Sequence, residues 1–151
     1  MSTLVEIAAE ETGRDYHPTG STTFKSEALQ KGFEPDSSFY FDQLASQVRG
    51  KEELDLRVDP APGLVIEVDM SRSSLNRLPI FAPAGVAEVW RYDGSIVRIY
   101  RLEDGAYVSE PFSTVLPPLT SEAIGSLLAG SAGMERPAWM RKVRAWVREH
   151  S

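Results

Sequence analysis

The chain of 151 residues carries 16 Lys and Arg, 22 Asp and Glu, and no cysteine. Its length suits about one domain, and 42% hydrophobic with 25% charged residues is ordinary for a globular protein with one core. The missing cysteine excludes disulfides and thiolate metal sites, so a metal would need oxygen ligands or the two histidines. The net charge of −6 argues against tight, non-specific nucleic-acid binding but leaves room for a local basic patch.

Signals for membranes and secretion are missing from the sequence. No run of about eighteen apolar residues appears, and the first residues lack the basic and apolar regions of a signal peptide. We therefore expect a cytoplasmic protein with no membrane span.

The first third of the chain mixes helical and strand patterns. Leu4, Ile7 and Ala8 recur at the spacing of one helix face. Asp42 is expected to cap a short helix with its side chain. In chain order, the patterns predict a helix over 3–12, a strand, a turn and a strand within 14–24, a turn or short helix over 26–31, a strand over 37–41, a helix over 42–48 and a surface loop over 51–62.

Residues 64–69 (Leu-Val-Ile-Glu-Val-Asp) predict a buried strand that carries two acids. Side chains two apart in a strand face the same way, so we expect Glu67 and Asp69 on one face, opposite Val68. Two carboxylates on an apolar strand repel each other and resist loss of water, which a divalent cation would relieve. The alternative is a strand end at the surface, with each acid solvated or paired to an arginine.

The second half predicts a helix, a meander of strands and two more helices. Pro79 lies within the first helical stripe, so that helix is expected to start late or to kink. The turns at 93–94 and 104–105 are Asp-Gly, a strong hairpin signal. The elements expected are a helix between 75 and 81, strands over 86–92, 95–102 and 107–109, and helices over 121–128 and 136–150.

The last helix is basic and amphipathic. One face carries apolar side chains, and the cations lie mostly elsewhere: Trp139, Val143, Trp146 and Val147 against Arg141, Lys142, Arg144 and Arg148. It could follow a DNA backbone, or pack its tryptophan face on the body or on a second subunit and leave its charges in water. We expect one domain over 1–133, with the helix of 134–151 packed on it, and a homodimer.

Three pieces of sequence together suggest a metal-dependent site. Asp36 follows a proline at the head of a strand, Glu67 and Asp69 share the central strand, and Arg77 lies on the helix after it. Carboxylates on neighbouring strands would line a cavity suited to Mg²⁺, which can polarise a phosphate and activate water. A cation such as Arg77 could hold that phosphate. Alternatively, Asp36 is a turn or cap residue and Arg77 is solvated.

At these segments the chain resembles the Uma-two family of proposed bacterial restriction endonucleases, part of the PD-(D/E)xK nuclease superfamily. The resemblance runs from about Thr12 to the C-terminus. It rests on Gly32-Phe33-Glu34-Pro35-Asp36, Leu64-Val65-Ile66-Glu67-Val68-Asp69, Ser73-Ser74-Leu75-Asn76-Arg77 and residues 85–94. It implies an α/β fold with a mixed sheet flanked by helices, and Mg²⁺- or Mn²⁺-dependent hydrolysis of DNA phosphodiesters.

The resemblance also implies roles for individual residues. Asp36 is the acid of the Pro-Asp motif, Glu67 is the second metal ligand, Val68 offers its carbonyl, and Asp69 stands where the superfamily usually has lysine. In this family that lysine has moved to position 77, here an arginine, which can hold phosphate but cannot act as a base.

Two further departures from the family pattern bear on activity. Phe81 replaces a frequent tyrosine, and family members usually carry a longer segment before the first helix. The expectation is an N-terminally short member of the family. The predicted function is a metal-dependent DNA endonuclease, and the alternative is an inactive nuclease-fold protein that serves as a dimeric binding or scaffold module.

Overall fold

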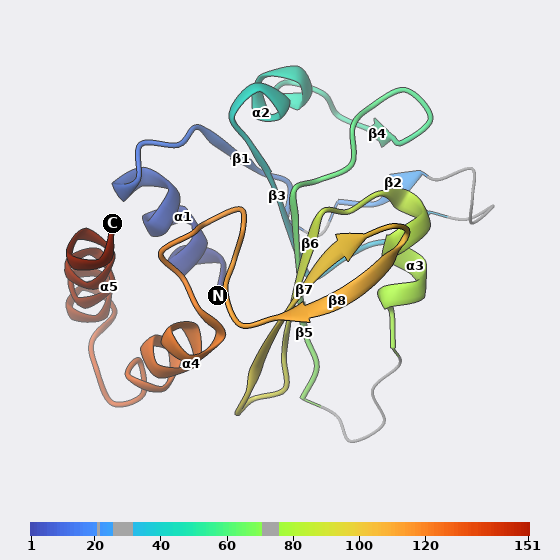
Figure 1. Cartoon of the computed structure of the whole chain (residues 1–151). Coiled ribbons are helices and arrows are strands. Elements are labelled where there is room, and N and C mark those ends of the chain that lie inside the picture. Colours follow the sequence, from blue (N-terminus) through green and yellow to red (C-terminus); the bar gives the residue numbers. More distant parts are fainter. Residues whose placement is uncertain (21, 26–31, 71–75) are drawn as a thin grey trace.

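A mixed six-stranded sheet forms the centre of the computed structural model, which describes residues 1–20, 22–25, 32–70 and 76–151 (Figure 1). Its strands, in spatial order, are β1 (Tyr16–Pro18), β3 (Ser37–Phe41), β5 (Leu64–Val68), β6 (Glu88–Tyr92), β7 (Val97–Glu103) and β8 (Ala106–Glu110). The β5–β6 pair is parallel and the other pairs are antiparallel. The predicted α/β class, with a mixed sheet flanked by helices, is confirmed.

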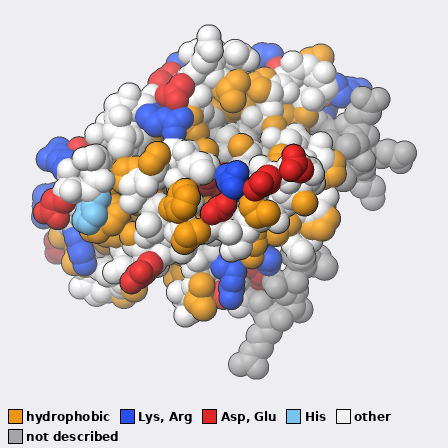
Figure 2. All heavy atoms as spheres, in the orientation of Figure 1, with side chains coloured by type: hydrophobic (Ala, Val, Ile, Leu, Met, Phe, Trp, Pro, Cys, Tyr) orange, Lys and Arg blue, Asp and Glu red, His pale blue; other side chains and the backbone are white. Residues whose placement is uncertain are grey.

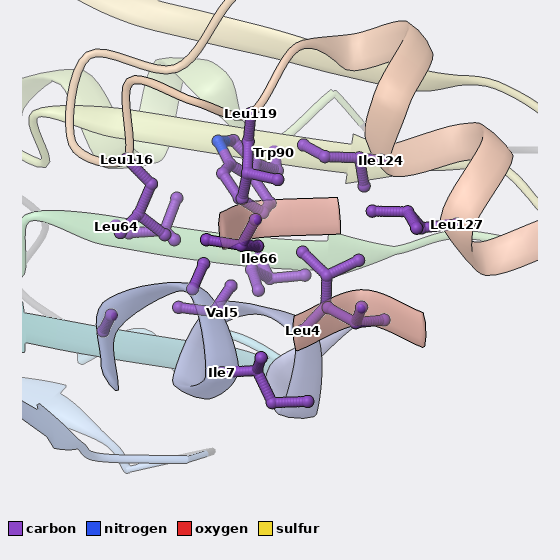
Figure 3. Close-up of a cluster of buried hydrophobic side chains, with 14 of the residues drawn as sticks. Leu4, Val5, Ile7, Leu64, Ile66, Trp90, Leu116, Leu119, Ile124 and Leu127 are labelled. Carbon is purple, nitrogen blue, oxygen red and sulfur yellow. The ribbon is translucent and has the colours of Figure 1, made fainter. Parts of the chain in front are cut away.

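Three helices cover the first face of the sheet: α1 (Ser2–Glu11), α4 (Ser121–Ala129) and α5 (Arg136–His150). Figure 3 shows Leu64, Ile66 and Trp90 of the sheet packed among side chains of α1, α4 and the segment before α4. Burying such large apolar side chains is the main stabilising contribution to the fold, at about 1.5–3 kcal/mol each. These residues fix β5 and β6 at the centre of the molecule.

The second face carries a smaller core. It is covered by α2 (Asp42–Val48), α3 (Leu78–Ala84) and a two-stranded parallel sheet of β2 (Phe24–Lys25) and β4 (Leu54–Asp55) (Figure 1). Val65 of β5 and Val89 of β6 point into this core, together with Phe81 of α3. Because side chains alternate along a strand, residue 67 of β5 and residue 91 of β6 lie on this same face.

The connection from β5 to β6 explains their parallel pairing. A parallel pair needs a crossover, and α3 supplies it. Pro79 lies in the first turn of α3, where a missing N–H costs little, so the helix begins late, as predicted. Gly85 ends the helix at φ +83°, a conformation that suits glycine.

Two local predictions were wrong, and two lie outside the described residues. The side chain of Asp42 does not cap α2; Phe41 is the N-cap, and Asp42 Oδ2 lies 2.6 Å from Arg14 Nη2. The predicted surface loop over 51–62 contains β4, whose parallel partner is β2. The turn or helix over 26–31 and the helix caps at 71–74 fall on residues that the structure does not describe.

The tryptophan-bearing helix α5 packs along α1 of the same chain. Trp139, Val143 and Val147 are buried, and Glu11 pairs with both Arg144 and Arg148, at 3.1 and 2.6 Å. The apolar face of α1 is therefore covered by α5 of the same chain.

In the described part of the chain, no helix has the length and apolarity needed to cross a membrane.

Candidate active site

Asp36 lies directly before β3, at the edge of the site formed by β3 and β5. Ser37 pairs with Ile66 in the β3–β5 ladder, which brings the preceding residue beside the end of β5. Asp36 Oδ2 accepts a hydrogen bond of 2.8 Å from the backbone N–H of Val68. This bond satisfies an amide at the end of the strand and anchors the carboxylate next to residue 67.

Glu67 is the acid at the centre of the site. It sits on the second face of β5 with only 7% of its surface exposed. Burial raises the pKa of its carboxyl to about 7, Arg77 opposes this rise, and the neighbouring Asp36 carboxyl adds to it. The sequence placed Asp36 and Glu67 together, and the structure does bring them together.

Arg77 is the cation that reaches this acid. It is the N-cap residue of α3, and its Nη1 lies 3.0 Å from Glu67 Oε1. Its Nη2 donates to the backbone carbonyl of Glu34 at 3.1 Å, and its guanidinium lies 5.4 Å from the ring centroid of Phe81. The alternative in which Arg77 is simply solvated is therefore wrong.

One oxygen of Glu67 remains without a hydrogen bond. Oε1 is buried and, among the described residues, has no hydrogen-bond donor, because its contact with Arg77 is an ion pair without hydrogen-bond geometry. A buried carboxylate oxygen is costly unless a cation or a donor reaches it, and here the Arg77 guanidinium is the cation that does so. Its position beside a second carboxylate fits the oxygen-only ligands that Mg²⁺ prefers.

Val68 and Asp69 complete the predicted set at the end of β5. Val68 is 43% exposed, so this end of the strand is open to solvent. The backbone N–H of Asp69 donates to the carbonyl of Tyr92 at 2.8 Å, and Asp69 Oδ2 lies 3.8 Å from Arg91 Nη2. Asp69 thus has an arginine neighbour on β6, in line with the alternative of acids paired to arginines, although the sequence did not identify Arg91 as that neighbour.

The site is built around two carboxylates. Within the described ranges, no three His, Cys, Asp or Glu side chains gather closely enough to hold a metal ion. Mg²⁺ usually keeps several waters and takes only one or two carboxylates from the protein. Asp36 and Glu67 could therefore hold such an ion with water and a backbone carbonyl, without a third acid.

Sequence reasoning missed two features around the site. Arg91 is the register partner of Glu67 in the parallel β5–β6 pair, and Arg98 is the partner of Arg91 on β7. On the opposite face, Glu88 is fully buried and accepts hydrogen bonds from Trp90, Ser113 and Thr114. A charged residue within an apolar strand was the signal in the sequence that could have pointed to these residues. Their partners could not be predicted, because they depend on the register between strands.

Comparison with known proteins places the chain in a family. It matches Uma2, described as "Putative restriction endonuclease", over residues 1–129, which leaves α5 outside the match. No curated protein matches the chain. The match begins and ends earlier than the resemblance read from the sequence, and it includes Asp36, Glu67, Asp69 and Arg77. With its mixed α/β fold, consistent with a restriction-endonuclease-like core, the chain belongs to the Uma2 family.

Proposed function

We propose that this protein is a Mg²⁺- or Mn²⁺-dependent endonuclease that hydrolyses phosphodiester bonds in DNA. The observation that carries the proposal is the pair Asp36 and Glu67, two carboxylates from neighbouring strands, with a Glu67 oxygen that is buried and lacks a hydrogen bond. Water and the carbonyl of Val68 are proposed to complete the ligand set, because among the described residues Asp69 does not gather with the other two acids into a group of three. The restriction-endonuclease description of the family supports nuclease chemistry.

A bound divalent cation would polarise the phosphate and lower the pKa of a water molecule. The chain's own residues supply position and charge. Asp36 is held by the Val68 amide, so its carboxylate is already oriented before any ligand arrives. Glu67 lies on a buried strand between β3 and β6, which gives it a rigid support.

Arg77 is proposed to face the phosphate. A guanidinium is charged at any working pH and can donate two parallel hydrogen bonds to a phosphate, but it cannot remove a proton from water. Its hydrogen bond to the Glu34 carbonyl holds the side chain over the site. Arg77 would therefore hold the phosphate and leave proton removal to another group.

One observation favours a second candidate, an inactive nuclease-fold protein that acts as a binding or scaffold module. The Arg77 guanidinium already offers Glu67 a positive charge at 3.0 Å, so the acid is partly neutralised without metal. A homodimer stays a prediction in either case. Light scattering of the purified protein would test it. A stable dimer should persist at about tens of micromolar protein, because mass action favours association at such concentrations, so a monomer there would contradict the prediction.

A nuclease assay separates the two candidates. Plasmid and single-stranded DNA are incubated with the protein, with and without Mn²⁺, and strand breaks are counted on gels. We expect cleavage by the wild type with Mn²⁺ and its loss in Glu67→Gln and Asp36→Asn. Glu52→Gln, which removes an exposed carboxylate in the loop before β4, is the matched control and should cleave as the wild type does. Breaks that persist at the wild-type level in Glu67→Gln would contradict the assignment of Glu67, and a wild type that makes no Mn²⁺-dependent breaks would favour the inactive candidate.

A further inference from the structure

Glu67, Arg91 and Arg98 form one row across three neighbouring strands. Glu67 pairs with Arg91 in the parallel β5–β6 ladder, and Arg91 pairs with Arg98 in the antiparallel β6–β7 ladder. All three lie on the second face of the sheet, and neighbouring strands lie about 4.8 Å apart. Arg91 and Arg98, without Glu67, are here named the arginine row. They extend the candidate site from β5 across β6 and β7.

Packing does not explain the arginine row. Like charges directly opposite each other on paired strands destabilise a sheet. Arg91 and Arg98 nevertheless occupy such opposite positions, with 23% and 50% of their side chains exposed. A surface that keeps two cations together at some cost in stability is a candidate for binding an anion.

The ion pairs of the arginine row are loose. Arg91 lies 3.8 Å from Asp69, and Arg98 lies 3.4 Å from Asp93. Among the described ion pairs these are the two longest, whereas Arg148 approaches Glu11 to 2.6 Å. The Arg98–Asp93 pair is exposed and the Arg91–Asp69 pair is partly exposed, and pairs at such distances contribute little to stability, so a phosphate could replace either acid at small cost.

The charge around the row depends on the metal. The group contains four carboxylates and three arginines: Asp36, Glu67, Asp69 and Asp93, with Arg77, Arg91 and Arg98. The formal charges of these groups add up to a negative value, and a divalent cation bound at the carboxylates would make the total positive. On the face shown in Figure 2, basic and acidic side chains are interspersed rather than separated by sign, so an acidic protein of this kind would have to bind DNA through a local patch.

We propose that the arginine row binds the DNA backbone beside the bond to be cut, with Arg91 and Arg98 each contacting a phosphate. The inference rests on the proposed function in taking DNA as the ligand. In this proposal β6 and β7 position the DNA strand, and the basic residues of α5 are not needed for binding. The arginine row would orient the DNA strand, whereas Arg77 would contact the phosphate next to the metal.

Salt dependence of binding tests this assignment. Anisotropy of a labelled DNA duplex is measured in Ca²⁺, a cation that oxygen ligands also hold, at several salt concentrations. Each phosphate contact contributes about 0.9 to the slope of log K against log salt. We expect Arg91→Gln and Arg98→Gln each to lower the slope by about 0.9, and the lysine variants to keep it. The control, Arg141→Gln with Lys142→Gln on exposed α5 positions, should leave it unchanged.

Slopes that stay at the wild-type value in both glutamine variants would overturn the inference, as would a wild type that shows no salt-dependent binding. A loss of slope in the α5 control alone would assign DNA binding to α5 instead. Cleavage is scored separately with Mn²⁺. Binding with the expected slopes but no cleavage would support the role of the arginine row in DNA binding and contradict the proposed nuclease activity. Cleavage with unchanged slopes would support the nuclease activity and contradict the role of the arginine row.

Discussion

Arg77 Nη1 lies 3.0 Å from Glu67 Oε1, in an ion pair that joins the start of α3 to the end of β5. Glu67 is almost fully buried, whereas about a third of the Arg77 side chain is exposed. The arginine can therefore turn toward solvent or a ligand, and the glutamate cannot. The Glu67 oxygen at this contact would be the one available to a metal when the guanidinium turns toward a phosphate.

The raised pKa of Glu67 makes stability depend on pH. In the unfolded chain this carboxyl titrates near 4.5, and in the folded protein near 7. Between these values the folded state holds a proton that the unfolded state has lost, so the free energy of unfolding falls as pH rises from about 4.5 to about 7. One pKa unit corresponds to about 1.4 kcal/mol, so the fall attributable to Glu67 is on the order of 3 kcal/mol.

Urea denaturation at pH 5 and pH 8, without metal, measures this effect. Glu67→Gln cannot ionise at this position, so it should lose less stability than the wild type between the two pH values. Glu52→Gln, with an exposed side chain, serves as the control and should follow the wild type. Equal pH dependence in the wild type and Glu67→Gln would show that Glu67 is ionised throughout.

Substitution of Arg77 tests both its ion pair with Glu67 and its proposed contact with the phosphate. Arg77→Ala leaves Glu67 without its nearest cation, so DNA cleavage should fall, and the free energy of unfolding at pH 8 should drop by about 1–2 kcal/mol. That is less than the 3–5 kcal/mol for a fully buried pair, because Arg77 is partly exposed. Arg77→Lys restores the charge and should keep or raise cleavage. Arg49→Ala, which breaks an exposed pair with Asp15, is the control. Equal cleavage in all these proteins would remove Arg77 from the site.

Glu88 on the opposite face should matter for stability and not for metal binding. Its carboxylate accepts hydrogen bonds of 2.6 Å from Trp90 Nε1 and Ser113 Oγ, and two of 2.8 Å from Thr114, which fasten the segment before α4 to the sheet. Glu88→Ala leaves several buried donors unpaired, so we expect a loss of more than about 3 kcal/mol in urea denaturation. Ser113→Ala removes one donor to Glu88 and leaves the Leu116 amide without its acceptor, so it should cost about 1–3 kcal/mol. A Glu88→Ala protein as stable as the wild type would contradict this role.

Local spacing predicted most elements of the fold. The helical repeat of Leu4, Ile7 and Ala8, the β-branched run at 64–68 and the Asp-Gly turns mark α1, β5 and the meander, because each signal lies within one element. The proline in α3 also predicted its late start. The parts decided by distant residues could not be predicted. Asp42 is drawn to Arg14, 28 positions earlier in the chain, instead of capping its own helix.

The candidate site likewise has residues that could be predicted from the sequence and residues that could not. Asp36, Glu67 and Arg77 were predicted from motif and resemblance, and the structure brings them together. Arg91 was missed, because its place beside Glu67 depends on the register of a parallel pair, and a shift by one residue would send its side chain to the other face.

The most direct test of the account is the thermal stability of the wild type with Mn²⁺, compared with Glu67→Ala, Asp36→Asn and the control Glu52→Gln. Binding at a hundredfold excess over the dissociation constant adds about 2.7 kcal/mol, or about 5–10 °C in Tm for a domain of this size. We expect this rise in the wild type and control, a smaller rise in Asp36→Asn and none in Glu67→Ala. Because the metal binds the ionised carboxyl, the rise should be greater at pH 8 than at pH 6. An unchanged wild-type Tm in millimolar Mn²⁺, with no binding by calorimetry, would contradict the account and leave the acids structural.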